Sequence, residues 1–214
     1  MNILLVDDHQ MMRDGLRAVL EKESDLHVVG EAADGRTALG LCATLRPDLV
    51  VMDIAMPELN GIEATRQLTA QHPRIRVVAL SMNADRRYVV AMFEAGAWGY
   101  LVKSSASEEL IRAIRAVAND EKYVSPSVAS AVVDRFVLGA RAPQKAPVSD
   151  LSPREREVLQ LLAEGLTSKE IAQRLSLAVS TVETHRKQIM SKLELRSVAE
   201  LTKFAIRAGL TTVE

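Results

Sequence analysis

The sequence contains few aromatic residues, which make up 3% of its 214 residues, and only one cysteine. Because 48% of the residues are hydrophobic, we expect a globular core, built mostly from aliphatic side chains. The single cysteine, Cys42, excludes an intramolecular disulfide. Cys42 lies between Leu41 and Leu45 on a predicted helix, a position that favours a buried, small apolar residue over a reactive thiol.

Long apolar runs and a large excess of one charge are also missing. No run approaches the roughly 18 apolar residues of a membrane span, and no charged and then apolar leader precedes the first predicted strand. We therefore expect a soluble, cytoplasmic protein. The net charge of -1 excludes a uniformly basic nucleic-acid-binding protein, but it is compatible with a local basic face.

Short apolar segments alternate with helical patterns from residue 2 to about 118. The apolar segments, typical of buried parallel strands, are 3–6, 27–32, 49–52, 77–80 and 100–102. The helical patterns span roughly 10–22, 35–45, 61–71, 85–95 and 107–119. This alternation predicts a doubly wound α/β domain with a five-stranded parallel sheet and right-handed connections.

Four of the predicted strands are each followed by a polar residue or an acidic pair. These residues are Asp7 with Asp8, then Asp53, Ser81 and Lys103. In open α/β sheets the carboxyl ends of the strands meet at one edge, where ligands bind. Three carboxylates, a hydroxyl and an ammonium at that edge would suit a divalent cation and a phosphoryl group. A strand-end aspartate can also accept the phosphoryl group covalently.

The second half of the chain has a different pattern. A helical segment at about 126–138 precedes residues 139–148, which are rich in Ala and Pro and form a predicted linker. Four helix-capping boxes follow, and they predict four short helices. The boxes are Ser152 with Glu155, Thr167 with Glu170, Ser180 with Glu183, and Ser197 with Glu200. We therefore predict a first domain at 1–122, a trailing helix and linker at 123–148, and a helical domain at 149–214.

The predicted helices 168–175 and 180–193 are joined by residues 176–179, the spacing of a helix-turn-helix. Val182, Ile189 and Leu193 share one face of the second helix and should be buried. The opposite face consists of Glu183, Thr184, Lys187, Gln188 and Ser191. By itself this face also fits an ordinary solvated side of an amphipathic helix. For Glu183 we favour helix capping over contact with a base.

Residues 1–118 resemble the receiver domain of two-component response regulators. The matching residues are Asp7-Asp8, the segment 53–61, Ser81, and the segment 99–103. The resemblance implies that Asp53 takes a phosphoryl group from a sensor histidine kinase with Mg²⁺. It further implies metal ligands, a phosphoryl-binding lysine and a switch pair. These are Asp7, Asp8, Asp53 and the Ala55 carbonyl for the metal, Lys103 for the phosphoryl group, and Ser81 with Tyr100 for the switch.

Residues 149–214 resemble the LuxR-type DNA-binding domain, on the motifs at 151–159, 165–172 and 180–190. The resemblance implies that the second helix of the helix-turn-helix contacts double-stranded DNA. The implied contact residues are Thr181, Glu183, Thr184, Arg186, Lys187, Gln188 and Lys192.

Together the two resemblances indicate a response regulator of the NarL type. Phosphorylation of Asp53 is then expected to gate homodimerisation and sequence-specific DNA binding, and the protein itself is not expected to be an enzyme. One alternative is a DNA-binding regulator that does not depend on phosphorylation, with the receiver as a dimerisation module. Another is a metal-dependent phosphatase that uses the same carboxylates.

Overall fold

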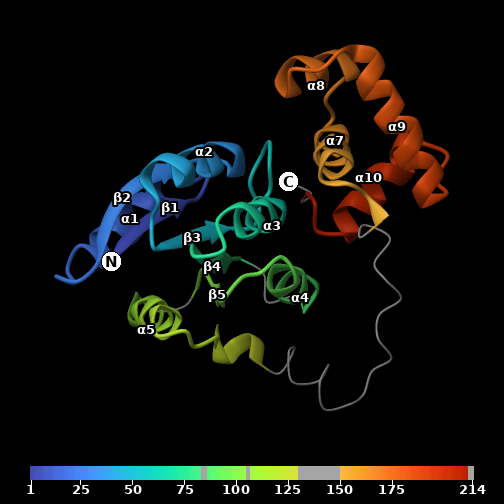
Figure 1. Cartoon of the computed structure of the whole chain (residues 1–214). Coiled ribbons are helices and arrows are strands. Elements are labelled where there is room, and N and C mark those ends of the chain that lie inside the picture. Colours follow the sequence, from blue (N-terminus) through green and yellow to red (C-terminus); the bar gives the residue numbers. More distant parts are fainter. Residues whose placement is uncertain (83–85, 105–106, 130–149, 212–214) are drawn as a thin grey trace. The chain divides into compact units, whose positions relative to one another are not determined.

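The computed structural model describes residues 1–82, 86–104, 107–129 and 150–211. The chain divides into two compact units, Met1–Gly139 and Ala140–Glu214 (Figure 1). No helix within the described ranges is long and apolar enough to cross a membrane. The predicted linker at 139–148 and most of the helix predicted at 126–138 fall outside these ranges, although residues 126–129 are helical.

The first unit is a parallel sheet flanked by helices, as the alternating pattern predicts. The strands are β1 (Asn2–Val6), β2 (His27–Ala32), β3 (Leu49–Asp53), β4 (Arg76–Ser81), β5 (Gly99–Val102) and β6 (Tyr123–Val124). Their order in the sheet is β2-β1-β3-β4-β5-β6. The helices are α1 (Gln10–Leu20), α2 (Gly35–Leu45), α3 (Gly61–Gln71), α4 (Arg86–Glu94) and α5 (Ser107–Ala118). The doubly wound class is therefore confirmed.

Two apolar cores cover the two faces of the sheet. Alternate residues of each strand point to opposite faces, so Ile3 and Leu5 enter one core while Leu4 and Val6 enter the other. The first core lies under α1 and α5, and the second lies under α2, α3 and α4. Cys42 is wholly buried in the second core, which confirms its predicted place, and burial raises the pKa of its thiol to about 12.

The sheet has one strand more than the five that the sequence predicts. The β6 strand is only two residues long, too short to produce a recognisable apolar pattern. It extends the sheet through Tyr123 N, which donates to Trp98 O at 3.0 Å, and through Ser125 N, which donates to Tyr100 O at 2.9 Å. The chain that follows α5 is therefore anchored to β5.

The second unit contains the four predicted helices. They are α7 (Pro153–Ala163), α8 (Ser168–Leu175), α9 (Val179–Leu193) and α10 (Val198–Arg207). One apolar core joins all four, with Val158, Ile171, Ile189 and Leu201 wholly buried in it. The α8–α9 pair has the connection expected of a helix-turn-helix.

Three of the four predicted capping boxes form, and the fourth prediction is wrong. In the boxes at Ser152, Thr167 and Ser197, the hydroxyl and the glutamate three residues later both bond to the backbone. The helix α9 instead begins at Val179 after Ala178, which makes no side-chain cap, so Ser180 lies inside the helix. Ser176 adopts a left-handed conformation that ends α8 at Leu175, as predicted, whereas α9 begins at Val179, one residue before its predicted start.

The close approach of α3 to the end of β3 depends on Gly61. Its backbone N–H donates to Ile54 O at 2.9 Å. A Cβ atom placed on Gly61 would lie 1.9 Å from the carbonyl oxygen of Asp53, much closer than any real contact. By contrast, a Cβ atom on the exposed Gly15 of α1 would meet nothing within 4 Å.

We predict that Gly61→Ala destabilises the first unit by about 1–3 kcal/mol, the usual cost of forced overpacking. Gly15→Ala, the matched control, should raise stability by about 0.4–1 kcal/mol because it restricts the unfolded chain. Urea unfolding followed by the fluorescence of Trp98, the single tryptophan, reports on this unit. Equal unfolding midpoints for the two variants would contradict the prediction.

Candidate functional site

Three charged side chains meet at the carboxyl edge of the sheet. Asp7 follows β1, Asp53 ends β3, and Lys103 follows β5. The Lys103 ammonium lies 2.7 Å from Asp7 Oδ2 and donates a hydrogen bond of 2.8 Å to Asp53 Oδ2. Asp7 and Asp53 are only 1% and 3% exposed, so these charges are removed from bulk water. The sequence prediction that these residues converge is therefore matched by the geometry.

Backbone N–H groups fix the other carboxylate oxygens. Ile54 N donates to Asp53 Oδ1 at 2.7 Å, and His9 N donates to Asp7 Oδ1 at 3.0 Å. Although Asp7 Oδ2 is buried beside the Lys103 ammonium, it accepts no well-directed hydrogen bond from the described residues. This oxygen thus keeps a lone pair available, and a buried acceptor of this kind suits a cation.

Burial and charge act in opposite directions on these groups. Burial raises the pKa of Asp53, the Lys103 ammonium lowers it, and the result is a raised pKa. For Lys103, burial lowers the pKa, but contacts with Asp53 and Asp7 outweigh it and the pKa is raised. Lys103 therefore remains an ammonium at neutral pH and supplies a fixed positive charge where a phosphoryl group would sit.

The residues fit a small divalent cation. One side-chain donor atom from each of Asp7, Asp8, His9 and Asp53 lies within 4.8 Å of the other three. Carboxylate oxygens are the ligands that Mg²⁺ prefers. The fourth member, His9, was not among the predicted ligands; its Nδ1 lies 2.6 Å from Asp8 Oδ1. Ala55, whose backbone carbonyl was the last predicted ligand, is an exposed residue of the turn after β3.

The predicted switch pair occupies neighbouring strands. Ser81 is the last residue of β4 and is 5% exposed, whereas Tyr100 on β5 is wholly buried. Tyr100 belongs to the core under α2, α3 and α4, together with Val89 and Met92. The Tyr100 side chain therefore lies inside this core in the structure. A coupled movement of the two residues stays a prediction.

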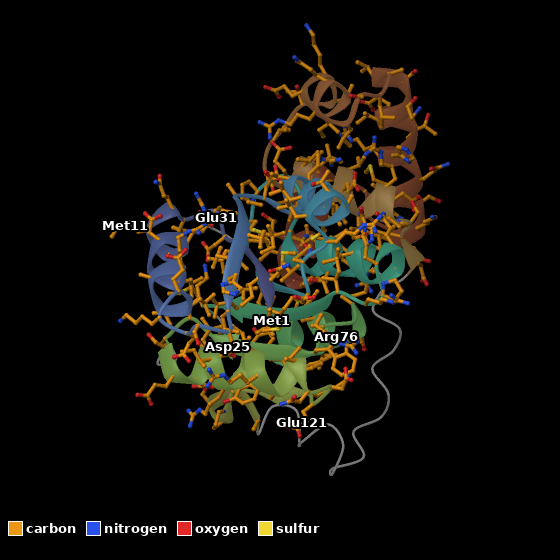
Figure 2. The ribbon with its side chains drawn as sticks, turned by 60° about the vertical axis from the view of Figure 1, so that its left-hand side comes forward. Met1, Met11, Asp25, Glu31, Arg76 and Glu121 are labelled. Atoms are coloured by element: carbon orange, nitrogen blue, oxygen red, sulfur yellow. The ribbon has the colours of Figure 1, made fainter. Side chains whose placement is uncertain are left out.

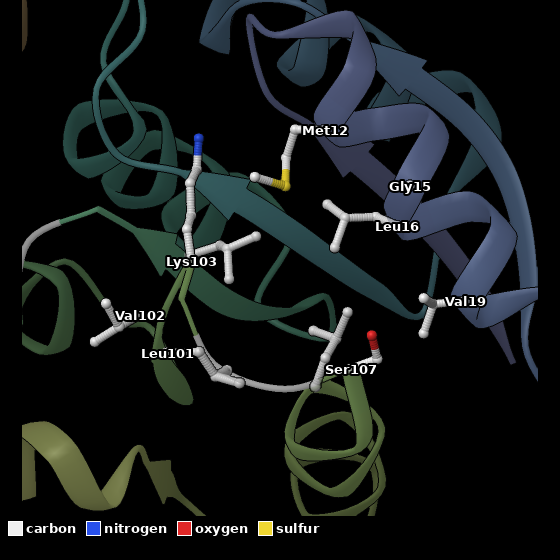
Figure 3. A pocket seen from close by; sticks show the side chains of 10 residues that line it. Met12, Gly15, Leu16, Val19, Leu101, Val102, Lys103 and Ser107 are labelled. Atoms are coloured by element: carbon white, nitrogen blue, oxygen red, sulfur yellow. The ribbon is translucent and has the colours of Figure 1, made fainter.

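A cavity of about 280 Å³ lies beside this edge, between α1 and α5 (Figure 3). Met12 and Leu16 line it from α1, Leu110 lines it from α5, and Lys103 stands at one end. Because most of its lining is aliphatic, this cavity does not resemble a site for a phosphate ester.

The predicted DNA-binding residues all lie on α9, and they differ in exposure. Val182 and Ile189 are buried, as predicted, and Leu193 is partly buried against the same core. The exposed predicted contacts are Thr184, Lys187, Gln188 and Lys192. The remaining three, Thr181, Glu183 and Arg186, are partly buried. The exposed residues form a polar, partly cationic surface of the kind that contacts bases and phosphates.

Two of the predicted contacts bond to other helices of the domain. Glu183 does not cap α9 as expected, but accepts a hydrogen bond from Ser168 Oγ at the start of α8. The Lys192 ammonium donates to Glu155 Oε2 at 2.7 Å, in the capping box of α7. Both residues therefore help to hold the helices together, and a role in DNA contact is additional to that.

Two family models match the chain. Residues 3–115 match the response regulator receiver domain, and residues 149–205 match the bacterial regulatory proteins of the luxR family. Response regulator UvrY of Escherichia coli is 36% identical over 100% of this chain and 97% of its own length. Transcriptional regulatory protein LiaR of Bacillus subtilis is 38% identical over 97% of this chain and 98% of its own length.

A solved structure of RcsB from Salmonella enterica serovar Typhimurium, bound to a promoter in the presence of phosphomimetic BeF₃⁻, is also similar. It is 28% identical, with a TM-score of 0.60, over 95% of this chain and 97% of RcsB. RcsB has also been solved as two dimers bound to two parallel DNAs. Since both halves match in the same order and full-length relatives exceed 30% identity, this chain belongs to the response regulators that join a receiver domain to a LuxR-type DNA-binding domain.

Proposed function

We propose that a sensor histidine kinase phosphorylates Asp53, and that phosphorylation gates homodimerisation and DNA binding. One observation carries the proposal. A buried ammonium, Lys103, bridges two buried carboxylates at the edge of the sheet where ligands bind. The same chain carries a helix-turn-helix with an exposed polar face. We propose that the protein acts in the cytoplasm, because the DNA that it would bind is located there.

In this proposal the phosphoryl group passes from a histidine nitrogen of the kinase to a carboxylate oxygen of Asp53. A P–N bond breaks and a P–O bond forms, while Lys103 offers its ammonium and Ser81 its hydroxyl to the phosphoryl oxygens. When bound, Mg²⁺ would neutralise charge on the phosphoryl oxygens. Asp7, Asp8, Asp53 and the Ala55 carbonyl would hold it.

The chemistry offers a physical reason for two states. Before phosphorylation, Lys103 neutralises the Asp53 carboxylate directly. Afterwards that oxygen carries a phosphoryl group with more negative charge and more acceptors, so Lys103 and Ser81 gain new partners. These contacts exist only in the phosphorylated form, and such differential contact is what shifts an equilibrium between conformations.

The output would be DNA binding by α9 in a homodimer. Relatives support this: RcsB is solved both with a promoter and phosphomimetic BeF₃⁻ and as dimers on DNA. A twofold dimer would place two copies of α9 one DNA turn apart, roughly 34 Å. We propose a receiver, a connecting segment and a DNA-binding domain near the predicted boundaries at 122 and 149, with β6 extending the receiver sheet to Val124.

Two other functions remain to be tested against this one. A regulator independent of phosphorylation would have no use for a pocket that buries two carboxylates and an ammonium. A phosphatase would need a polar substrate site, and the cavity beside Lys103 is mostly apolar. We therefore propose that the chain is not an enzyme acting on a separate substrate.

We predict that Asp53→Asn abolishes labelling of the protein by radioactive acetyl phosphate with Mg²⁺, because the amide cannot take the phosphoryl group. Asp14→Asn, which changes an exposed carboxylate on α1, is the matched control and should label like the unaltered protein. Undiminished labelling of Asp53→Asn would place the acceptor elsewhere.

We expect beryllofluoride with Mg²⁺, which mimics the phosphoryl group, to convert monomers to dimers and to tighten binding to duplex DNA. Sedimentation and fluorescence anisotropy of the same samples measure the two effects. Asp53→Asn should respond in neither assay. Equal assembly and equal DNA affinity with and without the mimic would support the regulator that does not depend on phosphorylation.

We predict that Lys187→Ala weakens binding to duplex DNA and lowers the salt dependence of binding by about one counterion, because it removes one positive charge from the helix face that we expect to enter the groove. Lys203→Ala changes another exposed lysine, on α10, and should leave both quantities unchanged. A salt titration of binding by anisotropy compares the variants. Equal losses for both would indicate a general charge effect instead.

A further inference from the structure

Arg13 on α1 reaches back to the acidic pair. Its Nη1 donates a hydrogen bond of 2.6 Å to the backbone carbonyl of Asp7. Its Nε donates to Glu31 Oε2 at 3.0 Å, so two sides of one planar guanidinium are engaged at once. The Arg13 side chain is only 15% exposed. Neither Arg13 nor Glu31 was among the residues predicted for the site.

The backbone that Arg13 holds is the segment that presents the carboxylates. Asp7 N donates to Ala32 O at 3.1 Å, the last link between β1 and β2. After this hydrogen bond the chain leaves the sheet, so the Asp7 carbonyl oxygen has no strand to supply a hydrogen-bond donor. Arg13 supplies it, and His9 N closes the turn onto Asp7 Oδ1. The peptide between Asp7 and Asp8 is therefore fixed by a side chain, not by the sheet.

Glu31 holds the guanidinium in this position. It lies on β2, opposite Leu5 of β1, and Figure 2 shows it beside α1. Arg17, one turn further along α1, also binds Glu31, at 2.7 Å, and binds Glu21 at 2.9 Å. Burial raises the pKa of Glu31, but hydrogen bonds from Arg17 and Arg13 outweigh it and lower the pKa, so Glu31 stays charged.

We propose that Arg13 is a positioning residue for the phosphorylation site. Held by Glu31, it fixes the Asp7 carbonyl and thereby sets where the carboxylates of Asp7 and Asp8 stand toward the cation. A planar guanidinium that donates to two groups at once fixes direction as well as distance, which a simple ion pair does not. The inference rests on the proposed function, because it concerns the cation at that same site.

Arg17 is a natural control that distinguishes positioning of the cation site from simple anchoring of α1. Arg13 and Arg17 lie on the same helix and share Glu31, so both tie α1 to β2. Of these two arginines, Arg13 also donates to the Asp7 carbonyl, whereas Arg17 binds Glu21 instead. If these arginines served only to anchor the helix, removal of either would affect the cation site to the same small extent.

The test compares Arg13→Met with Arg17→Met in the full-length chain. Calorimetry gives the Mg²⁺ dissociation constant, and a thermal melt without Mg²⁺ gives stability. We expect Arg13→Met to weaken Mg²⁺ binding roughly tenfold to a hundredfold, the usual effect of removing a residue that orients metal ligands. Arg17→Met should stay within about twofold of the unaltered protein, the small effect of a partly exposed ion pair. Saturating Mg²⁺ should restore acetyl phosphate labelling of Arg13→Met.

Two further variants sharpen the test. Arg13→Lys keeps the charge but cannot span both partners, so most of the loss in Mg²⁺ affinity should remain, and full rescue would overturn the proposal. Glu31→Gln keeps Arg13 but removes the negative charge that holds its guanidinium. We therefore expect a partial loss of Mg²⁺ affinity, which can be measured even if Arg13→Met fails to fold.

Unchanged Mg²⁺ affinity in Arg13→Met, or an equal loss in Arg17→Met, would also overturn the proposal. Failure of the unaltered protein to take label at Asp53 would instead refute the proposed function, so the two failures are distinguishable.

Discussion

The structure of the receiver depends on one electrostatic constraint, the burial of two carboxylates against a single ammonium. Asp7 and Asp53 share Lys103, so the buried group keeps an excess negative charge. Such an excess is costly in a medium of low dielectric constant unless a cation offsets it. This excess charge is the physical basis of the affinity for a divalent cation, and then for a phosphoryl group, that we propose for the pocket.

Strand packing, a close helix approach and backbone hydrogen bonds hold these three charged groups in place. The strands are short and mostly apolar, so the two cores pack against both faces of the sheet and align the strand ends. Gly61 lets α3 approach the Asp53 carbonyl, and Asp53 and Asp7 each accept a backbone N–H. In the second unit, Glu183 and Lys192 connect α9 to α8 and α7, and α9 is the helix that carries the predicted DNA contacts.

Some sequence predictions were inaccurate where tertiary contacts override local patterns. The Ser180 box has the right residues for a cap, but Glu183 instead accepts a hydrogen bond from Ser168 of α8, and α9 begins at Val179 after Ala178. The β6 strand exists only because β5 offers a free edge to two residues that carry no pattern of their own. In both cases the deciding partner lies elsewhere in the chain, which local spacing cannot reveal.

By itself the sequence determined the order of elements, the two-part architecture and the set of polar residues at the strand ends, because apolar periodicity and strand-end placement are local properties. Only the tertiary structure decided which side chains come into contact. Lys103 lies between two carboxylates, His9 joins the acidic cluster, and Arg13 donates a hydrogen bond to the Asp7 carbonyl. The physical reason is that an ion pair or a side-chain clamp depends on distances of about 3 Å between residues remote in sequence. Those distances are set by packing of the whole sheet and its helices, not by any one segment.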